Sequence, residues 1–145
     1  MYKISLLSKA DLIESYDIEK NINPKPWTFK NFMSSYEIGH KGLICKENKE
    51  VLGFIIFSPI QKEAHLLNIG VKKNYQKRGV GKLLMHSMIS QCKAMSIRNI
   101  YLEVRVGNKN AINFYLNFNF KKDAIREGYY SGKNPEDALL MSLQI

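Results

Sequence analysis

The chain has 145 residues, of which 45% are hydrophobic, and a formal net charge of +9. This length allows one compact domain and is too short for two of ordinary size, so we expect a single domain over residues 1–145. The longest apolar stretch with strand character, residues 51–57, is far shorter than the roughly 20 residues that cross a bilayer. The first residues lack the pattern of a secretory signal. We therefore expect a cytoplasmic protein without a membrane partner.

Basic residues are concentrated in one segment of the chain. Between Lys72 and Arg105 there are eight basic residues and a single acidic one, Glu103. Such a bias fits either diffuse affinity for nucleic acid or a site for one multiply phosphorylated ligand. Cys45 and Cys92 lie far apart, and the three histidines have no metal-ligand spacing. We expect two free, buried thiols and no metal.

Turn residues and hydrophobic periodicity predict the elements of the first half. A short strand over residues 3–6 precedes a helix that begins at residues 8–11 and continues to about Tyr16. Thr28 is the expected N-cap of a second helix, which runs to about Tyr36. Three strands follow, at residues 42–45, 51–58 and 64–71, with charged or proline-containing turns between them. Their order is typical of an antiparallel meander.

From Gly79 the apolar period changes to three and four residues, which predicts an amphipathic helix to about Met95. Residues 100–105 alternate between apolar and polar as a half-buried strand does, so they complete a crossover βαβ unit. A short helix follows at about 110–116, with closing strand material at 118–122, 124–130 and 138–143. The prediction is an α/β (α+β) fold with a mixed central sheet of six to seven strands and about four helices on its two faces.

A glycine-punctuated turn lies between the last strand of the meander and the amphipathic helix. Residues 76–81 read Gln-Lys-Arg-Gly-Val-Gly. The first N–H groups of a helix have no internal partner and carry partial positive charge, and a glycine-rich turn lets an anion approach them. A dinucleotide motif would need a third glycine where Leu84 stands, and a Walker loop would need G-K-[ST]. The turn alone is also compatible with an ordinary strand-to-helix connection.

Residues 76–81 resemble the Q/R-x-x-G-x-G/A motif of the GCN5-related N-acetyltransferases (GNAT). Residues 108–115 with Phe120 are similar to a later motif of that family, N-x-x-A-x-x-x-Y-x-x-x-G-F. Asn119 stands where the family usually has glycine. Because asparagine tolerates the left-handed conformation better than most residues, we expect the turn to survive this change.

Four further segments narrow the resemblance: residues 26–28 with Phe32, 67–71, 101–105, and 126–130 with 136–138. Together they are similar to the ribosomal-protein-alanine N-acetyltransferase (RimI) type. The resemblance implies the GNAT fold, acetyl-CoA as cosubstrate, and direct transfer to the N-terminal alanine of a small-subunit ribosomal protein of the S-eighteen type. Gly70 stands where the family usually has alanine, and we expect it at a bulge where the strand opens for the acetyl-pantetheine arm.

The resemblance also implies roles for individual residues. Glu103 would be the general base, acting through water, and Tyr115 the acid that protonates the departing thiolate. The Val71 N–H would polarise the thioester carbonyl, and Tyr129 and Tyr130 would form a wall of the peptide groove. The implied cofactor-binding residues are Ile69, Gly70, Val71, Gln76, Lys77, Arg78, Gly79, Val80, Gly81, Lys82 and Asn108.

Structural explanations remain open for several of these residues. Strand alternation alone predicts a polar residue at Glu103, and Tyr115 has the aromatic neighbours of a core residue. Tyr129 and Tyr130 also fit hairpin packing. Asn108 fits the cap of the helix that carries Tyr115.

The acceptor can be weighed by its basicity. An α-amino group has a pKa of about 7.7 to 8.0 and a lysine amine about 10.4, so deprotonating lysine costs roughly 3 to 4 kcal/mol more at neutral pH. A carboxylate base therefore suits the N-terminal peptide of a ribosomal protein. The alternatives are another protein N-terminus, a lysine, or a small-molecule amine. A non-catalytic module that binds RNA or retains acetyl-CoA is a further hypothesis, but coenzyme phosphates explain the basic segment without direct nucleic-acid binding.

Overall fold

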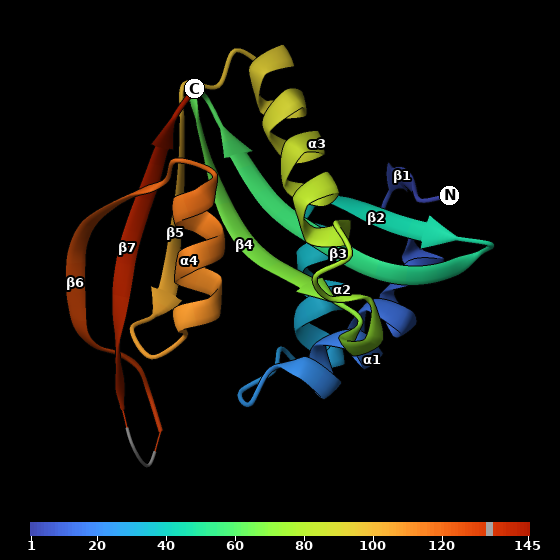
Figure 1. The fold of residues 1–145 in the computed structure, drawn as a ribbon, viewed down its shortest axis with the longest axis horizontal. Helices are drawn as coiled ribbons and strands as arrows, with labels where there is room; N and C mark the ends of the chain where they lie inside the picture. The colour runs from blue at the N-terminus through green and yellow to red at the C-terminus, as the bar shows by residue number, and fades with distance from the viewer. Residues whose placement is uncertain (133–134) are drawn as a thin grey trace.

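The computed structural model describes residues 1–132 and 135–145, and these residues form a seven-stranded mixed sheet with helices on both faces (Figure 1). The strand order is β1-β2-β3-β4-β5-β7-β6, and the β4–β5 pair is parallel whereas its neighbours are antiparallel. The strands are β1 (Lys3–Leu6), β2 (Lys41–Glu47), β3 (Glu50–Ile60), β4 (Glu63–Val71), β5 (Asn99–Arg105), β6 (Lys121–Tyr130) and β7 (Glu136–Gln144). The helices are α1 (Leu12–Ile22), α2 (Phe29–Ile38), α3 (Val80–Ala94) and α4 (Lys109–Asn117), with 3-10 turns at Lys9–Asp11 and Lys73–Tyr75.

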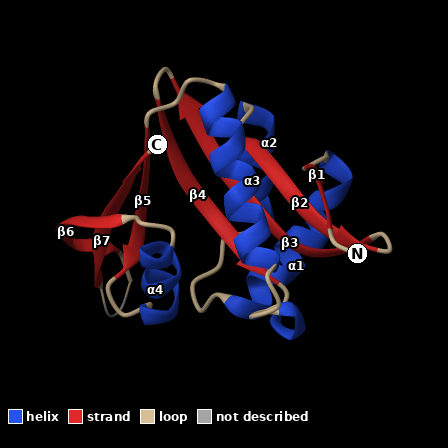
Figure 2. Ribbon diagram, turned by 45° about the horizontal axis from the view of Figure 1, so that its top comes forward, coloured by secondary structure: helices blue, strands red, loops and turns tan. Residues whose placement is uncertain are grey.

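Two hydrophobic cores lie on opposite faces of this sheet. Helices α3 and α4 contribute Leu84, Met88 and Ile112 to the larger core, together with the buried side chains of β5. Helices α1 and α2 cover the other face, where Phe32 packs edge-on against Phe54 with ring centroids 5.4 Å apart. Figure 2 shows α3 and α4 in front of the sheet and α1 and α2 behind it. The predicted α/β arrangement, with the meander and the crossover from β4 through α3 to β5, is confirmed.

Strands β4 and β5 open like a V. Within the described residues their pairing is limited to Glu63–Asn99, Ala64–Ile100 and His65–Tyr101. Figure 1 shows the two strands close together near the C-terminus of the chain and separating toward the far end of β4. A gap therefore opens in the middle of the sheet, in front of the turn that leads into α3.

A bulge in β4 begins where the strands separate. Ile56 pairs with Asn68 whereas Phe57 pairs with Leu66, so Leu67 is the extra residue. The prediction that Gly70 occupies the bulge is wrong. Glycine is needed at position 70 for space, because an added Cβ would lie 2.7 Å from the Phe54 ring.

Two predicted boundaries are also wrong. The first helix continues past Tyr16 to Ile22, because its later turns still bury Ile18 and Glu19 against the sheet. Residues 118–122 form no strand of their own, since β6 starts at Lys121 and the preceding residues close helix α4. Asn119 has the predicted left-handed conformation, with φ of 70°.

Other local predictions are confirmed. The Thr28 side chain accepts a hydrogen bond from the Asn31 N–H at 3.1 Å and caps α2. Cys45 and Cys92 are free and buried, and burial raises the pKa of both thiols, to about 11 for Cys92. None of the helices in the described residues is long and apolar enough to cross a membrane.

Candidate active site

The turn before α3 has a backbone that only a few residue types adopt. Gly79, the N-cap of α3, has φ of +88°, and Lys77 also has a positive φ, 63°. A side chain at Gly79 would meet no atom within 4 Å, so glycine is needed there for its backbone conformation and not for space. Val80 is fully buried and fixes the start of the helix in the core. The exposed turn thus presents the unpaired N–H groups of the first turn of α3.

Two contacts join this turn to the open end of β4. The Gln76 side chain donates to the Val71 carbonyl at 3.1 Å. A Cβ added at Gly81 would lie 3.5 Å from both Phe114 and Val71, which is an ordinary contact distance. Gly81 therefore lies close to Phe114 of α4 and Val71 of β4 and leaves room for a Cβ.

The charge around the turn suits an anion. Lys77, Arg78 and Lys82 are exposed, and none of them takes part in the ion pairs of residues 1–132 and 135–145. Lys72 differs, because its ammonium lies 2.6 Å from the Glu50 carboxylate, and this hydrogen bond raises the pKa of Lys72. Three cations and a helix N-terminus can together hold a phosphate or pyrophosphate group.

The register of β3 and β4 shows which backbone groups face the gap. The Lys72 N–H donates to the Leu52 carbonyl at 2.7 Å, so Gly53 and Val71 form a pair without hydrogen bonds between them. The N–H and C=O groups of Val71 therefore point away from β3, into the V. The backbone N–H and C=O groups of Ile69 point in the same direction as those of Val71. Those of Gly70 point toward β3 and pair with Phe54. Of the three predicted residues, Ile69 and Val71 present polar backbone groups to the gap.

Glu103 lies on the other side of the gap, in β5. It is exposed and pairs with Leu140 of β7 through the backbone. Leu102 and Val104 point into the core of α3 and α4, so alternation places Glu103 on the opposite face. Arg105 lies on the same face as Glu103. The feature of the sequence that could have identified it is its two-residue spacing from Glu103 along the strand. The sequence did not single it out for a role.

Tyr115 projects from α4 and is 8% exposed. Burial raises its pKa, and the nearby Tyr130 raises it further. Burial also raises the pKa of Tyr130; the Arg105 guanidinium opposes this rise and Glu103 adds to it. Tyr130 is thus an electrostatic neighbour of both Glu103 and Tyr115. The two predicted catalytic residues thus lie on consecutive elements, β5 and α4.

Structural explanations for some predicted residues are visible as well. The Asn108 side chain accepts from the Ala111 N–H at 3.2 Å and caps α4. The rings of Tyr129 and Tyr130 lie 5.0 Å apart at 84°, as packing within a hairpin requires. Each also stacks with an arginine, Tyr129 with Arg126 at 4.6 Å and Tyr130 with Arg105 at 4.3 Å. These contacts order the two side chains.

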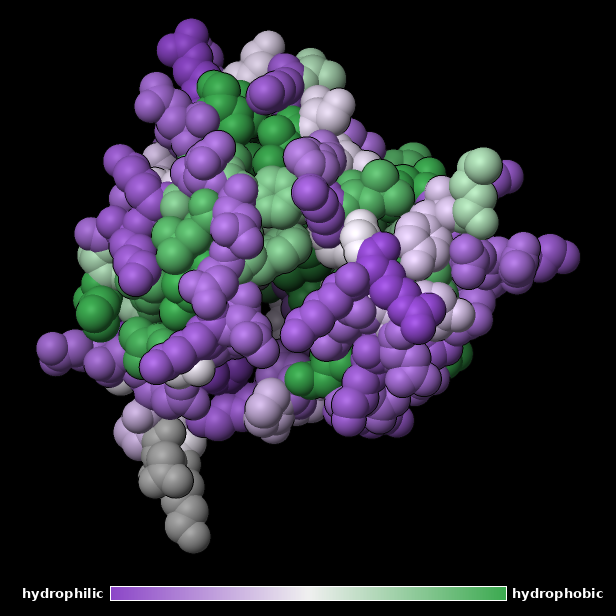
Figure 3. Space-filling model, in the orientation of Figure 1, coloured by the Kyte–Doolittle hydropathy of each residue, from purple (hydrophilic) through white to green (hydrophobic). Residues whose placement is uncertain are grey.

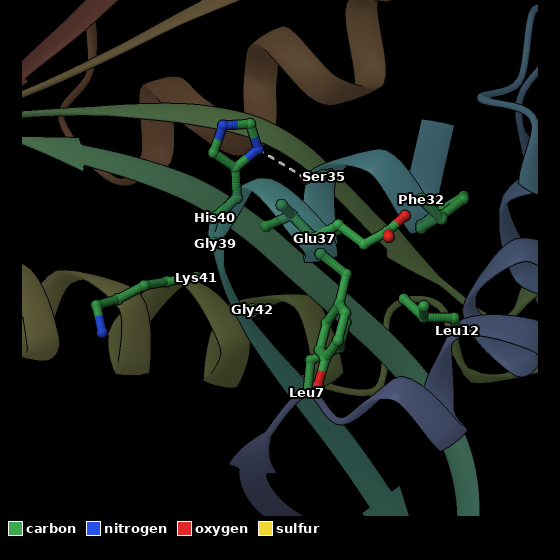
Figure 4. Close-up of a pocket in the computed structure, with 11 residues that line it drawn as sticks. Leu7, Leu12, Phe32, Ser35, Glu37, Gly39, His40, Lys41 and Gly42 are labelled. Atoms are coloured by element: carbon green, nitrogen blue, oxygen red, sulfur yellow. Dashed lines mark hydrogen bonds between the residues drawn. The ribbon is translucent and has the colours of Figure 1, made fainter. Parts of the chain in front are cut away.

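The surface is hollowed between α3 and α4, and hydrophilic side chains surround the hollow (Figure 3). A separate cavity of about 380 Å³ lies at the end of α2, where Ser35 Oγ and His40 Nδ1 are 2.7 Å apart above Leu12 and Phe32 (Figure 4). A second, of about 450 Å³, lies between α1 and residues 72–74. Neither is lined by a predicted site residue. The candidate site is therefore the open V and not either cavity.

Comparison with known proteins agrees with this architecture. Residues 11–120 match the model of the acetyltransferase (GNAT) family. The chain belongs to this family and is an acetyl-CoA-dependent N-acetyltransferase. The family and the GNAT fold predicted from the sequence are confirmed.

Individual relatives match over the whole chain. The ribosomal protein bS18-alanine N-acetyltransferase of Escherichia coli strain K12 is 33% identical over 146 residues, which cover 100% of this chain and 99% of the relative. The enzyme of the same name from Salmonella typhimurium is 32% identical with the same coverage. A crystal structure of the Escherichia coli ribosomal-protein-alanine N-acetyltransferase superposes with a TM-score of 0.93, covering 100% of this chain and 94% of the other. Ard1 from Thermoplasma volcanium, 25% identical, gives 0.92 and coverages of 99% and 97%.

Proposed function

We propose that this chain acetylates the N-terminal alanine of ribosomal protein bS18, the small-subunit protein S-eighteen, by direct transfer from acetyl-CoA. Full-length similarity to enzymes named for that reaction supports the acceptor. The observation that carries the chemistry is the V between β4 and β5, with the Val71 N–H on one side and Glu103 on the other. In this proposal residues 1–145 act in the cytoplasm as one acetyltransferase domain.

The cosubstrate would lie along the inner edge of β4. Its pyrophosphate meets the N–H groups and cations of residues 76–82, which the left-handed Gly79 makes accessible. Ile69 and Val71 offer backbone hydrogen bonds to the pantetheine arm, since their N–H and C=O groups point into the gap. Gly70, between them, packs against the Phe54 ring. Asn108 holds the start of α4 and borders the arm from the opposite side.

The residues on either side of the gap supply the proton transfers. Acetyl-CoA supplies an acetyl thioester, and its carbonyl oxygen would accept from the Val71 N–H. Glu103, exposed to solvent, takes a proton from the attacking amine through a water molecule as the C–N bond forms. Tyr115 gives its phenolic proton to the coenzyme sulfur as the C–S bond breaks. The raised pKa of Tyr115 keeps that proton in place at neutral pH.

The acceptor would reach the gap from the side on which Glu103, Tyr129 and Tyr130 lie. Freeing an α-amine from its proton near pH 7 costs roughly 1 kcal/mol, whereas a lysine amine costs about 4 to 5 kcal/mol. A partly solvated carboxylate such as Glu103 can meet the smaller cost. This argument favours a protein N-terminus over a lysine.

Mass spectrometry of a peptide product tests the proposal. The enzyme is incubated with acetyl-CoA and a peptide that has the N-terminal sequence of bS18, and the site of acetylation is located by fragmentation. We expect one acetyl group on the α-amine and none on the same peptide with that amine blocked. Turnover of the blocked peptide would move the acceptor to a lysine, and no product from either peptide would reject the substrate.

A further inference from the structure

Glu19 is a buried acidic residue with no place in the reaction described above. It lies near the end of α1 on the face that packs against the sheet, and it is 1% exposed. In the described part of the chain it forms no ion pair with a lysine, arginine or histidine. A carboxylate that is taken out of water without a counter-ion is costly unless hydrogen bonds compensate for its lost hydration.

The compensating bonds come from three donors in two segments of the chain. Glu19 Oε2 accepts from Asn68 Nδ2 at 3.0 Å, from the Trp27 backbone N–H at 3.0 Å, and from Asn23 Nδ2 at 3.3 Å. Asn68 directly follows the bulge in β4, and Trp27 lies in the α1–α2 loop, residues 23–28. One oxygen atom therefore connects the α1–α2 loop to β4 at the point where the strand separates from β5.

The α1–α2 loop lies at the mouth of the V. Figure 1 shows this loop, in blue, projecting below the end of β4 toward the end of β6. A Cβ added at Gly132, just after the end of β6, would lie 3.6 Å from Lys25 Nζ, so the two segments approach each other across the opening. Trp27 packs on the fully buried Phe32 with ring centroids 5.2 Å apart, which fixes the other end of the loop.

We propose that Glu19 is a positioning residue for the acceptor. It holds the α1–α2 loop against the bulged part of β4, so that the loop forms one wall of the acceptor entrance opposite Tyr129 and Tyr130. This inference rests on the proposed function in one respect, the identity of the acceptor as a peptide. Glu19 touches neither the acetyl group nor the attacking amine.

The hydrogen bonds that Glu19 accepts predict different results for two substitutions. Glu19→Ala removes the oxygen that all three donors share, and the loop loses its link to Asn68. Glu19→Gln keeps one carbonyl oxygen for Trp27 and Asn68 and is the matched conservative variant. Asp17→Ala is a control on the same helix, because the Asp17 side chain is 55% exposed and pairs with Lys20 at the surface.

Kinetics and fluorescence together test the inference. We expect Glu19→Ala to raise the KM for the acceptor peptide about tenfold while the KM for acetyl-CoA stays within about twofold. Glu19→Gln should stay within about threefold of the parent for both substrates. Trp27 is the only tryptophan in the chain, so its emission reports on the loop alone. It should shift to the red and become more accessible to acrylamide in Glu19→Ala, and it should not change in Asp17→Ala.

Asn68→Ala provides a second test if Glu19→Ala does not fold. It keeps the carboxylate and the Trp27 bond but breaks the link to β4, so the acceptor KM should again rise more than the acetyl-CoA KM. Equal rises in both KM values, or a lower melting temperature with an unchanged acceptor KM, would overturn the inference. If the parent does not acetylate the peptide, the proposed function fails by itself. The Trp27 measurements need no acceptor and still decide whether Glu19 holds the loop.

Discussion

The Arg105 guanidinium lies 4.3 Å from the centroid of the Tyr130 ring. This contact joins β5, which carries the proposed base, to the end of β6, which borders the proposed acceptor entrance. The Glu136 carboxylate lies 3.9 Å from Arg105 Nε on the other side. Arg105 thus holds the Tyr130 ring beside β5, and its charge opposes the rise in the pKa of Tyr130 that burial causes.

Glu103→Gln tests the general base. Glutamine has nearly the same shape but cannot accept the amine proton, so we expect kcat/KM to fall roughly 10²- to 10⁴-fold. The side chain is exposed and the strand pairing uses only backbone groups, so the melting temperature should change little. Glu63→Gln is the matched control, since Glu63 is exposed at the start of β4, where the strands are still paired. Full activity in Glu103→Gln would contradict this role, because the amine proton would then have to go to another group.

Tyr115→Phe tests the acid by removing one oxygen atom. We expect kcat to fall roughly 10²-fold or more, with the acetyl-CoA KM little changed. The substitution also changes how stability depends on pH. Because the folded protein raises the pKa of Tyr115, it holds the phenolic proton more tightly than the unfolded chain, in which the phenol titrates near pH 10. The free energy of unfolding should therefore fall as pH rises above about 10 in the parent.

Urea unfolding at pH 8, 10 and 11 measures this effect. Tyr115→Phe should lose less stability than the parent over that interval, while Tyr130 contributes in the same direction to both proteins. Identical pH profiles would mean that Tyr115 keeps an ordinary pKa in the folded protein.

The fold could be predicted from the sequence because its signals are local. The strand alternation of residues 100–105 and the change of period at Gly79 each depend on neighbours a few positions away. The N-cap at Thr28 and the left-handed Asn119 are local in the same sense. The end of α1 was not predicted, because residues 17–22 are mostly polar and their helix is stabilised by tertiary contacts such as those of Glu19.

The site was predicted only as a set of positions. Motif spacing indicates Glu103 and Tyr115 as candidates, but the position of Tyr130 relative to them depends on the pairing of β5 with β7 and of β7 with β6. The position of the bulge was wrong for a related reason, since the collision of a residue-70 side chain with Phe54 is a contact between strands. The pairing of Phe54 with Gly70 depends on the register between β3 and β4, which the residue pattern within either strand does not report.

The two cysteines should be unreactive in the folded protein. Both are fully buried, and desolvation raises the pKa of the Cys92 thiol to about 11, so little of it is thiolate near neutral pH. Iodoacetamide at pH 8 should therefore label neither residue in the native protein and both in denaturant, as counted by intact mass. Rapid labelling of the native protein would show that α3 or β2 opens to solvent.

Gly79 and Gly81 should differ although both belong to the turn motif. Gly79→Ala places a side chain at φ of +88°, which costs about 1 to 2 kcal/mol of strain or forces the turn into another conformation. The N–H groups at the start of α3 would then be misdirected, so we expect the KM for acetyl-CoA to rise at least about tenfold.

Gly81→Ala adds a methyl group at ordinary contact distances and lies in the first turn of α3, so it should keep the parent melting temperature or raise it. Gly79→Asn, which tolerates the left-handed region, should fall between the parent and Gly79→Ala in calorimetry and in the acetyl-CoA KM. Equal effects of alanine at the two positions would show that the conformation of the turn is not what holds the coenzyme.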